Sequence, residues 1–108
     1  MSAALSFDDL KARAAGLQFR HQAFIGGRYV DAAGGETFDC ISPVDGRVLT
    51  KVAACGAEDV DRAVKAARAA FESGVWAGLA PKARKAVLLK FAELIEQHRD
   101  ELALLETL

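Results

Sequence analysis

Two cysteines carry the only thiols of this 108-residue sequence, and a thiolate is the strongest nucleophile among protein side chains. Cys55 stands just before a predicted helix start, where the helix dipole favours an anion, so it is the better nucleophile candidate than Cys40. Neither belongs to a CxxC pair and neither has a histidine nearby, which argues against a disulfide framework and a zinc site. Because no base or oxyanion motif accompanies them, we interpret both as structural cysteines and expect no catalytic residue.

The two histidines give little evidence for a catalytic or metal-binding site. His21 precedes a predicted hairpin, and His98 lies where a long helical pattern breaks, where it could cap the last helix. We expect neither to have a histidine, cysteine or acidic neighbour at metal-ligand spacing. A metal site built from side chains is therefore not expected.

Four basic residues cluster in the first half of a predicted long helix and could contact an anionic partner. They are Lys82, Arg84, Lys85 and Lys90. Fourteen basic residues stand against fifteen acidic ones, and the net charge of -1 favours a solvated face that pairs with acids. Neither a nucleic acid nor an anionic membrane surface is expected as a partner.

The glycine pairs Gly26-Gly27 and Gly34-Gly35 are the only candidates for phosphate-binding loops. Neither occurs in a GxGxxG or GxxxxGK[ST] pattern, and neither is followed by a helix whose N-terminus could hold a phosphate. We interpret the first pair as a hairpin turn and the second as a loop. No cofactor-binding residue is therefore predicted.

The composition of the whole chain indicates the class of protein to which these residues belong. Hydrophobic residues make up 52% and charged residues 27%, as in an ordinary globular domain of this length. Apolar runs are too short to span a bilayer, and the first residues lack the basic stretch and apolar core of a signal peptide. We expect a cytoplasmic protein without membrane contacts.

The first half of the chain predicts one short helix and antiparallel strands. Ser6 as N-cap and Gly16 as a stop delimit a helix over residues 7–15. Two apolar runs around Gly26-Gly27 predict a hairpin, because a tight turn needs positive φ at its centre. Strands over 37–42 and 47–53, joined by a Pro-Val-Asp-Gly turn, would complete an antiparallel meander.

The second half predicts two or three helices. One runs from Gly56 to Gly74 with acid–base pairs on its outer face, Glu58–Arg62 and Asp61–Lys65. Val75-Trp76 follows as an apolar plug, and the next helix begins at Pro81. A break near 98–100 separates it from a final short helix. The predicted buried stripes are Val60, Ala63, Val64, Ala67 and Phe71, then Val87, Leu88, Phe91, Leu94 and Ile95, then Leu102, Leu105 and Leu108.

Several ordered motifs between Phe24 and Leu108 resemble the aldehyde dehydrogenase superfamily. The helix segment Glu58–Phe71 is very similar to the family's E-D-V-D-x-A-V-x-A-A-R-x-A-F pattern, and Trp76 stands where the family has its Trp. The turn Ile41–Gly46 resembles x-N-P-x-[TD]-G, although Ser42 replaces the commoner Asn. Further matches are Phe24–Val30 with F-I-x-G-x-[WY], Arg84 in R-x-x-[LV]-L, Leu94–Glu96 with L-A-D-L-I-E and Leu105–Leu108 with L-E-T-L.

The resemblance implies a parent enzyme of the α/β class that oxidises an aldehyde to a carboxylic acid with NAD or NADP. In that family a cysteine attacks the aldehyde, hydride passes to the nicotinamide, and a water activated by glutamate releases the acid. These residues and the dinucleotide cleft belong to later sequence, so this chain alone should be inactive and bind no cofactor tightly. The family's monovalent cation site maps onto the main-chain carbonyls of Cys40 and Ile41, as ligands of Na+ or K+.

Finer matches resemble the bacterial enzymes for γ-glutamyl-γ-aminobutyraldehyde or 4-guanidinobutyraldehyde in polyamine and arginine breakdown. The resemblance implies a helical extension over residues 1–20 and an incomplete cofactor-binding domain over 21–108, as an α+β piece. It also implies an aldehyde substrate and a homo-oligomer. The chain ends inside an apolar pattern, which predicts an N-terminal fragment. The alternative is a stand-alone, non-catalytic structural or oligomerisation module.

Overall fold

The computed structural model describes residues 5–108 and confirms an α+β piece with four helices and two small antiparallel sheets. Residues 1–4 of the predicted extension over 1–20 lie outside the described residues. Among the described helices, none is long and apolar enough to cross a bilayer. The elements, in chain order, are α1 (Phe7–Ala15), β1 (Ala23–Ile25), β2 (Arg28–Val30), β3 (Thr37–Ile41), β4 (Val48–Ala53), α2 (Ala57–Glu72), α3 (Pro81–Gln97) and α4 (Arg99–Thr107).

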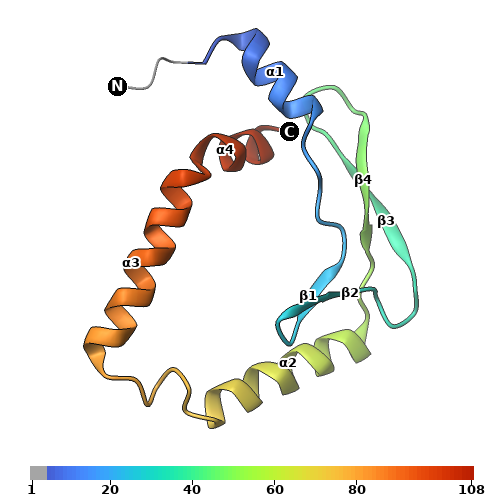
Figure 1. Ribbon diagram of the computed structural model, residues 1–108. Coiled ribbons are helices and arrows are strands. Elements are labelled where there is room, and N and C mark those ends of the chain that lie inside the picture. Colours follow the sequence, from blue (N-terminus) through green and yellow to red (C-terminus); the bar gives the residue numbers. More distant parts are fainter. Residues whose placement is uncertain (1–4) are drawn as a thin grey trace.

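These elements follow one another around an open ring (Figure 1). The helices α2, α3 and α4 form one side, the two hairpins form the other, and α1 meets α4 where the ring closes. Arg13 and Asp100 form an exposed ion pair at this closure, with 3.5 Å between Nη1 and Oδ2. The ring is flat, with extents of 48 × 43 × 17 Å.

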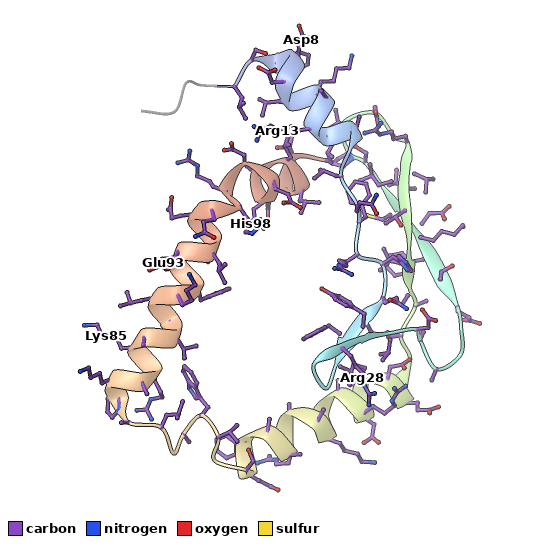
Figure 2. The ribbon with its side chains drawn as sticks, viewed as in Figure 1. Asp8, Arg13, Arg28, Lys85, Glu93 and His98 are labelled. Atoms are coloured by element: carbon purple, nitrogen blue, oxygen red, sulfur yellow. The ribbon has the colours of Figure 1, made fainter. Side chains whose placement is uncertain are left out.

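The ring shape leaves almost no hydrophobic core. The radius of gyration is 18.1 Å, whereas a compact domain of this length has about 13 Å. Ala32 is the only buried hydrophobic residue among residues 5–108. The predicted apolar stripes of α2 and α3 and the plug at Val75-Trp76 are therefore wrong as buried surfaces, since these side chains are largely exposed. Within the described chain the β1–β2 hairpin contacts α2 at its alanine side, where Ala63 is half-buried (Figure 2).

The first helix confirms the predicted caps. Ser6 Oγ accepts a hydrogen bond from the N–H of Asp9 at 3.2 Å, and the Asp9 carboxylate accepts one from the N–H of Ser6 at 3.1 Å. The hydrogen bonds from Ser6 lower the pKa of Asp9 below its ordinary value. Gly16 ends the helix as predicted. A short polar sequence is sufficient to set both ends because every partner is local.

The strands form two separate hairpins rather than one continuous meander. The β1–β2 hairpin turns at Gly26 and Gly27, whose φ angles of 61° and 80° are both in the left-handed region, as the sequence predicts. The β3–β4 hairpin has a register shift between Cys40 and Ile41. In the described chain β2 does not pair with β3, so the predicted meander is wrong at this connection.

The helices begin and end close to the predicted residues. Pro81 occupies the first turn of α3, and His98 separates α3 from α4. The pair Asp61–Lys65 is present at 2.7 Å, but Arg62 pairs with Asp59 at 3.6 Å instead of with Glu58. Asp59 also accepts a hydrogen bond from the N–H of Ala33, in the loop after β2, and this tertiary contact places its carboxylate beside Arg62.

Candidate functional site

The most buried charged group of the described chain is at the start of α2. The Asp59 side chain is only 3% exposed, although it carries a charge. Its Oδ1 accepts a hydrogen bond from the N–H of Ala33 at 2.9 Å, and its Oδ2 accepts one from the N–H of Gly56 at 3.0 Å. The guanidinium of Arg62 lies 3.6 Å from Oδ1. We call this arrangement the Asp59 junction.

The environment of Asp59 stabilises its ionised form. The hydrogen bond from Gly56 lowers the pKa of Asp59 most, the one from Ala33 adds to this, and Arg62 contributes a smaller attraction. Burial acts in the opposite direction and is outweighed. Because both carboxylate oxygens already accept backbone hydrogen bonds, the group is suited to hold the loop after β2 against α2 rather than to move protons.

Sequence reasoning missed this junction. Asp59 appears there only as one letter of the α2 motif. Its position three residues after Gly56, which precedes the helix, is a local signal for a carboxylate that caps the helix. The contact with Ala33, 26 residues earlier, has no sequence signal of its own.

The other strongly buried polar residue, Ser42, is also used for structure. Its N–H donates to the carbonyl of Arg47 at 2.9 Å, and its own carbonyl accepts from the N–H of Gly46 at 2.9 Å. Its Oγ accepts from the N–H of Val44 at 3.2 Å. Gly46 has a φ of 73°, which closes the predicted turn. Ser42 therefore fixes the turn between β3 and β4.

The structure does not gather the sequence candidates into one site. Cys40 is half-buried in β3, whereas Cys55 is exposed between β4 and α2. Within residues 5–108 there is no cluster of three or more His, Cys, Asp or Glu that could hold a metal. His98 does have an acidic neighbour, contrary to expectation, since its Nδ1 lies 3.5 Å from Glu101. His98 occupies the N-cap position of α4 as the sequence suggests, but its side chain makes no capping hydrogen bond.

The basic cluster of α3 is partly used within the chain. Arg84 Nη1 donates to the carbonyls of Ala77 at 3.1 Å and Leu79 at 2.9 Å. Lys90 pairs with Glu93 at 3.0 Å. These contacts favour the solvated-face interpretation over a site for an anionic partner.

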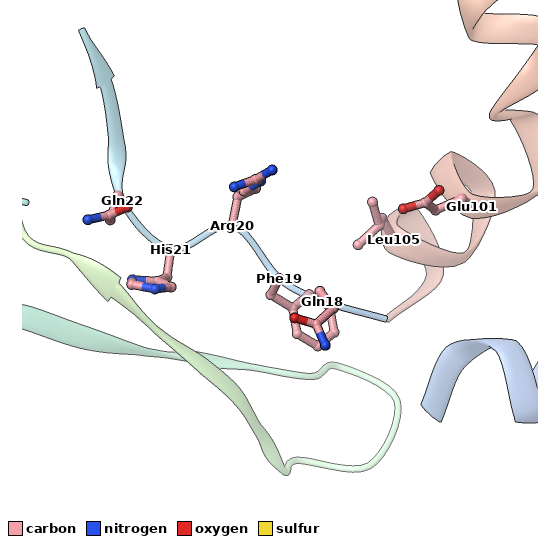
Figure 3. A pocket seen from close by; sticks show the side chains of 7 residues that line it. All are labelled: Gln18, Phe19, Arg20, His21, Gln22, Glu101 and Leu105. Carbon is pink, nitrogen blue, oxygen red and sulfur yellow. The ribbon is translucent and has the colours of Figure 1, made fainter. Parts of the chain in front are cut away.

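A cavity of about 720 Å³ lies between the segment after α1 and helix α4 (Figure 3). It is lined by Gln18, Phe19, Arg20, His21, Gln22, Glu101 and Leu105. Its charged groups make other contacts: the guanidinium of Arg20 lies 4.5 Å from the centre of the Tyr29 ring, and Glu101 pairs with His98. The lining therefore provides no nucleophile–base pair.

The described residues do not form a dinucleotide site. Both sheets are two-stranded and antiparallel, whereas dinucleotides bind where parallel strands meet helix N-termini. At the one direct strand-to-helix connection, from β4 to α2, the carboxylate of Asp59 already binds the N–H of Gly56. A second anion is disfavoured there by charge repulsion.

Comparisons with known proteins show the family to which this chain is similar. The aldehyde dehydrogenase family matches residues 29–108. Aminoacetaldehyde dehydrogenase of Pseudomonas aeruginosa is 49% identical over 108 residues, which is all of this chain and 22% of that protein. The crystal structure of γ-glutamyl-γ-aminobutyraldehyde dehydrogenase from Burkholderia cenocepacia has 60% identity and a TM-score of 0.93 over 96% of this chain and 21% of that one.

A third relative shows the same backbone in a complex with bound small molecules. The indole-3-acetaldehyde dehydrogenase of P. syringae, in complex with NAD+ and IAA, has 58% identity and a TM-score of 0.94 over 97% of this chain and 21% of that one. The chain thus spans about a fifth of the length of these relatives. The family match and the shared backbone together establish that this chain belongs to the aldehyde dehydrogenase family.

Proposed function

We propose that this chain is the N-terminal part of an NAD(P)-dependent aldehyde dehydrogenase and has no dehydrogenase activity by itself. The observation that carries the proposal is a backbone shared at a TM-score of 0.93–0.94 with enzymes about five times as long. The relative from P. syringae holds NAD+, which supports NAD as the cofactor of the whole enzyme. The ring supplies neither a nucleophile–base pair nor a dinucleotide site among its described residues.

The alternative, a stand-alone structural module, is disfavoured by the exposed apolar side chains. Phe71 is 71% exposed and Phe91 is 61% exposed, although both belong to regular apolar stripes. An independent module would expose such stripes to water and aggregate. We assign residues 21–108 to an incomplete cofactor-binding domain, preceded by an extension over 1–20. The cytoplasmic location and homo-oligomeric assembly stay predictions.

For the substrate we propose an aminoaldehyde of the γ-glutamyl-γ-aminobutyraldehyde or 4-guanidinobutyraldehyde type. Support comes from the two relatives named for aminoacetaldehyde and γ-glutamyl-γ-aminobutyraldehyde. The competing substrate is indole-3-acetaldehyde, named for a relative of similar identity.

The substrate proposal predicts a clear preference in kinetics. The enzyme encoded by the native gene should show a kcat/KM at least about tenfold higher for γ-glutamyl-γ-aminobutyraldehyde than for indole-3-acetaldehyde, which corresponds to about 1.4 kcal/mol of transition-state binding. Measuring NADH formation with each aldehyde at matched concentrations tests this. Equal values, or a preference for the indole, would refute the aminoaldehyde assignment.

We further propose that the main-chain carbonyls of Cys40 and Ile41 are two ligands of a Na+ or K+ ion. The register shift between these residues interrupts the β3–β4 ladder there, and carbonyl oxygen is a suitable hard ligand. Its remaining ligands would come from the rest of the enzyme. Exchanging Na+ and K+ for choline at constant ionic strength should lower the thermal midpoint of the native enzyme by a few degrees. An unchanged midpoint contradicts the site.

A further inference from the structure

The turn between β3 and β4 fixes the direction of one main-chain carbonyl. The N–H of Ser42 donates to the carbonyl of Arg47, just before β4, at 2.9 Å. The described chain has no cis peptide bond, and in a planar trans peptide the C=O and the N–H point in opposite directions. The carbonyl of Ile41 belongs to the same peptide group as the N–H of Ser42. Its oxygen therefore points away from β4.

The Ile41 oxygen also lacks a donor from a neighbouring strand. Within residues 5–108, β3 pairs with β4 and with no other strand. A carbonyl that points away from β4 therefore lies outside the ladder of hydrogen bonds. An unpaired carbonyl oxygen of fixed direction is a suitable hard ligand for Na+ or K+. The Ile41 carbonyl thus fits the cation site proposed above.

Ser42 holds this peptide group in place through its polar groups. The residue is only 1% exposed. Its carbonyl accepts from the N–H of Gly46 at 2.9 Å, and its Oγ accepts from the N–H of Val44 at 3.2 Å. Without the hydroxyl, this part-buried N–H would lose its acceptor and the turn would relax. The Ser42 side chain therefore stiffens the turn that directs the Ile41 carbonyl.

We propose that Ser42 is a positioning residue for a bound Na+ or K+ ion, because its hydroxyl holds the turn that directs the Ile41 carbonyl toward the ion. The inference rests on the cation site of the proposed function and extends it to a side chain that is not itself a ligand. Groups that orient metal ligands in this way typically change metal affinity by about 10- to 100-fold when they are replaced.

The experiment uses the enzyme encoded by the native gene and three substitutions of one residue. Ser42→Ala removes the acceptor, and Ser42→Cys keeps nearly the same size but accepts hydrogen bonds only weakly. Ser42→Asn retains an oxygen that can accept from the N–H two residues along, and Asn is the commoner residue in the motif that this turn resembles. These variants separate the acceptor from the size of the side chain.

Asp45→Ala is the matched control in the same turn. The carboxylate of Asp45 accepts a hydrogen bond from the N–H of Arg47 at 3.1 Å, and this contact is exposed. The substitution removes one hydrogen bond of the turn but leaves those of Ser42 in place. It therefore tests whether any loosening of the turn has the same effect.

The readout is the thermal midpoint while NaCl or KCl replaces choline chloride at constant ionic strength. An ion that binds only the folded enzyme raises the midpoint as its concentration rises, and the concentration that gives half of this rise reports its affinity. Ser42→Ala and Ser42→Cys should need at least about tenfold more ion than the wild type. Ser42→Asn and Asp45→Ala should stay within about twofold of the wild type.

A purely structural role of Ser42 gives a different result. The midpoints of Ser42→Ala and Ser42→Cys would then fall equally in choline and in Na+ or K+, and the ion concentration for half of the rise would not change. That result would overturn the inference, and so would a tenfold change in Asp45→Ala. If Ser42→Ala does not fold, Ser42→Cys decides the test by itself.

Failure of the inference can be distinguished from failure of the proposed function. A wild-type midpoint that is the same in Na+, K+ and choline would overturn the cation site and the role of Ser42 with it. A wild type that responds to the ion, with Ser42 variants that respond identically, would overturn the role of Ser42 alone. The dehydrogenase assignment depends on NADH formation, which the melting measurement does not involve.

Discussion

Replacing Asp59 with asparagine is expected to lower the thermal midpoint of the enzyme encoded by the native gene by about 2–3 °C at pH 7, because a loss of about 2–3 kcal/mol is spread over a protein about five times the length of this chain. The carboxylate accepts hydrogen bonds from Ala33 and Gly56 on its two oxygens. An asparagine has one acceptor oxygen, so its amide group would face one of these N–H donors and leave it unpaired. Differential scanning fluorimetry of the wild-type and variant enzymes measures the difference.

Asp61→Asn is the matched control, with the same substitution two residues along the same helix. The Asp61 side chain is exposed and pairs only with Lys65, at 2.7 Å in the structure. An exposed pair of this kind contributes less than about 1 kcal/mol, so the midpoint should change by less than about 1 °C. Equal effects of the two substitutions would show that the Asp59 junction does not hold the loop.

The effect of Asp59 also has a defined pH dependence. Its folded-state pKa lies below the ordinary 3.8, so its contribution is fully present above that value and is lost as the pH falls through the lower folded pKa. The difference between wild type and Asp59→Asn should therefore stay constant from pH 8 to pH 5. A difference that shrinks within this range would contradict the low pKa.

Helix boundaries could be predicted because their determinants are local. Ser6, Gly16 and Pro81 act through backbone groups within one helical turn, and the structure places all three at helix ends. The glycine pair of the β1–β2 turn is equally local, since its positive φ angles are a property of those two residues. Such features need no knowledge of the remaining chain.

Burial could not be predicted in the same way. The spacing of Phe91 and Leu94 correctly identifies an apolar helix face, but a periodic pattern contains no information about what covers that face. In this ring nothing does, so the expected core is absent. The separation of the two hairpins is a similar case. A sequence pattern shows clearly which segments are extended, but it gives only a weak signal for which of these segments pair with each other.

In the candidate site, too, local features could be predicted from the sequence and tertiary contacts could not. The prediction that Cys40 and Cys55 are structural cysteines rests on the missing base and oxyanion motif and stays a prediction. The sequence did not identify Asp59, whose role depends on a contact with Ala33 that only the folded chain creates. It also predicted the wrong partner for Arg62, because a helical periodicity does not reveal that Asp59 is drawn inward.

The measurement that tests the central claim most directly compares the product of the native gene with the 108-residue chain. Intact mass is determined for the native product, and both proteins are assayed for NADH formation with NAD+ and γ-glutamyl-γ-aminobutyraldehyde. We predict a native mass about five times the 11.5 kDa of this chain, with turnover, and no turnover by the chain alone. A native product of 11.5 kDa, or NADH formation by the isolated chain, would contradict the account.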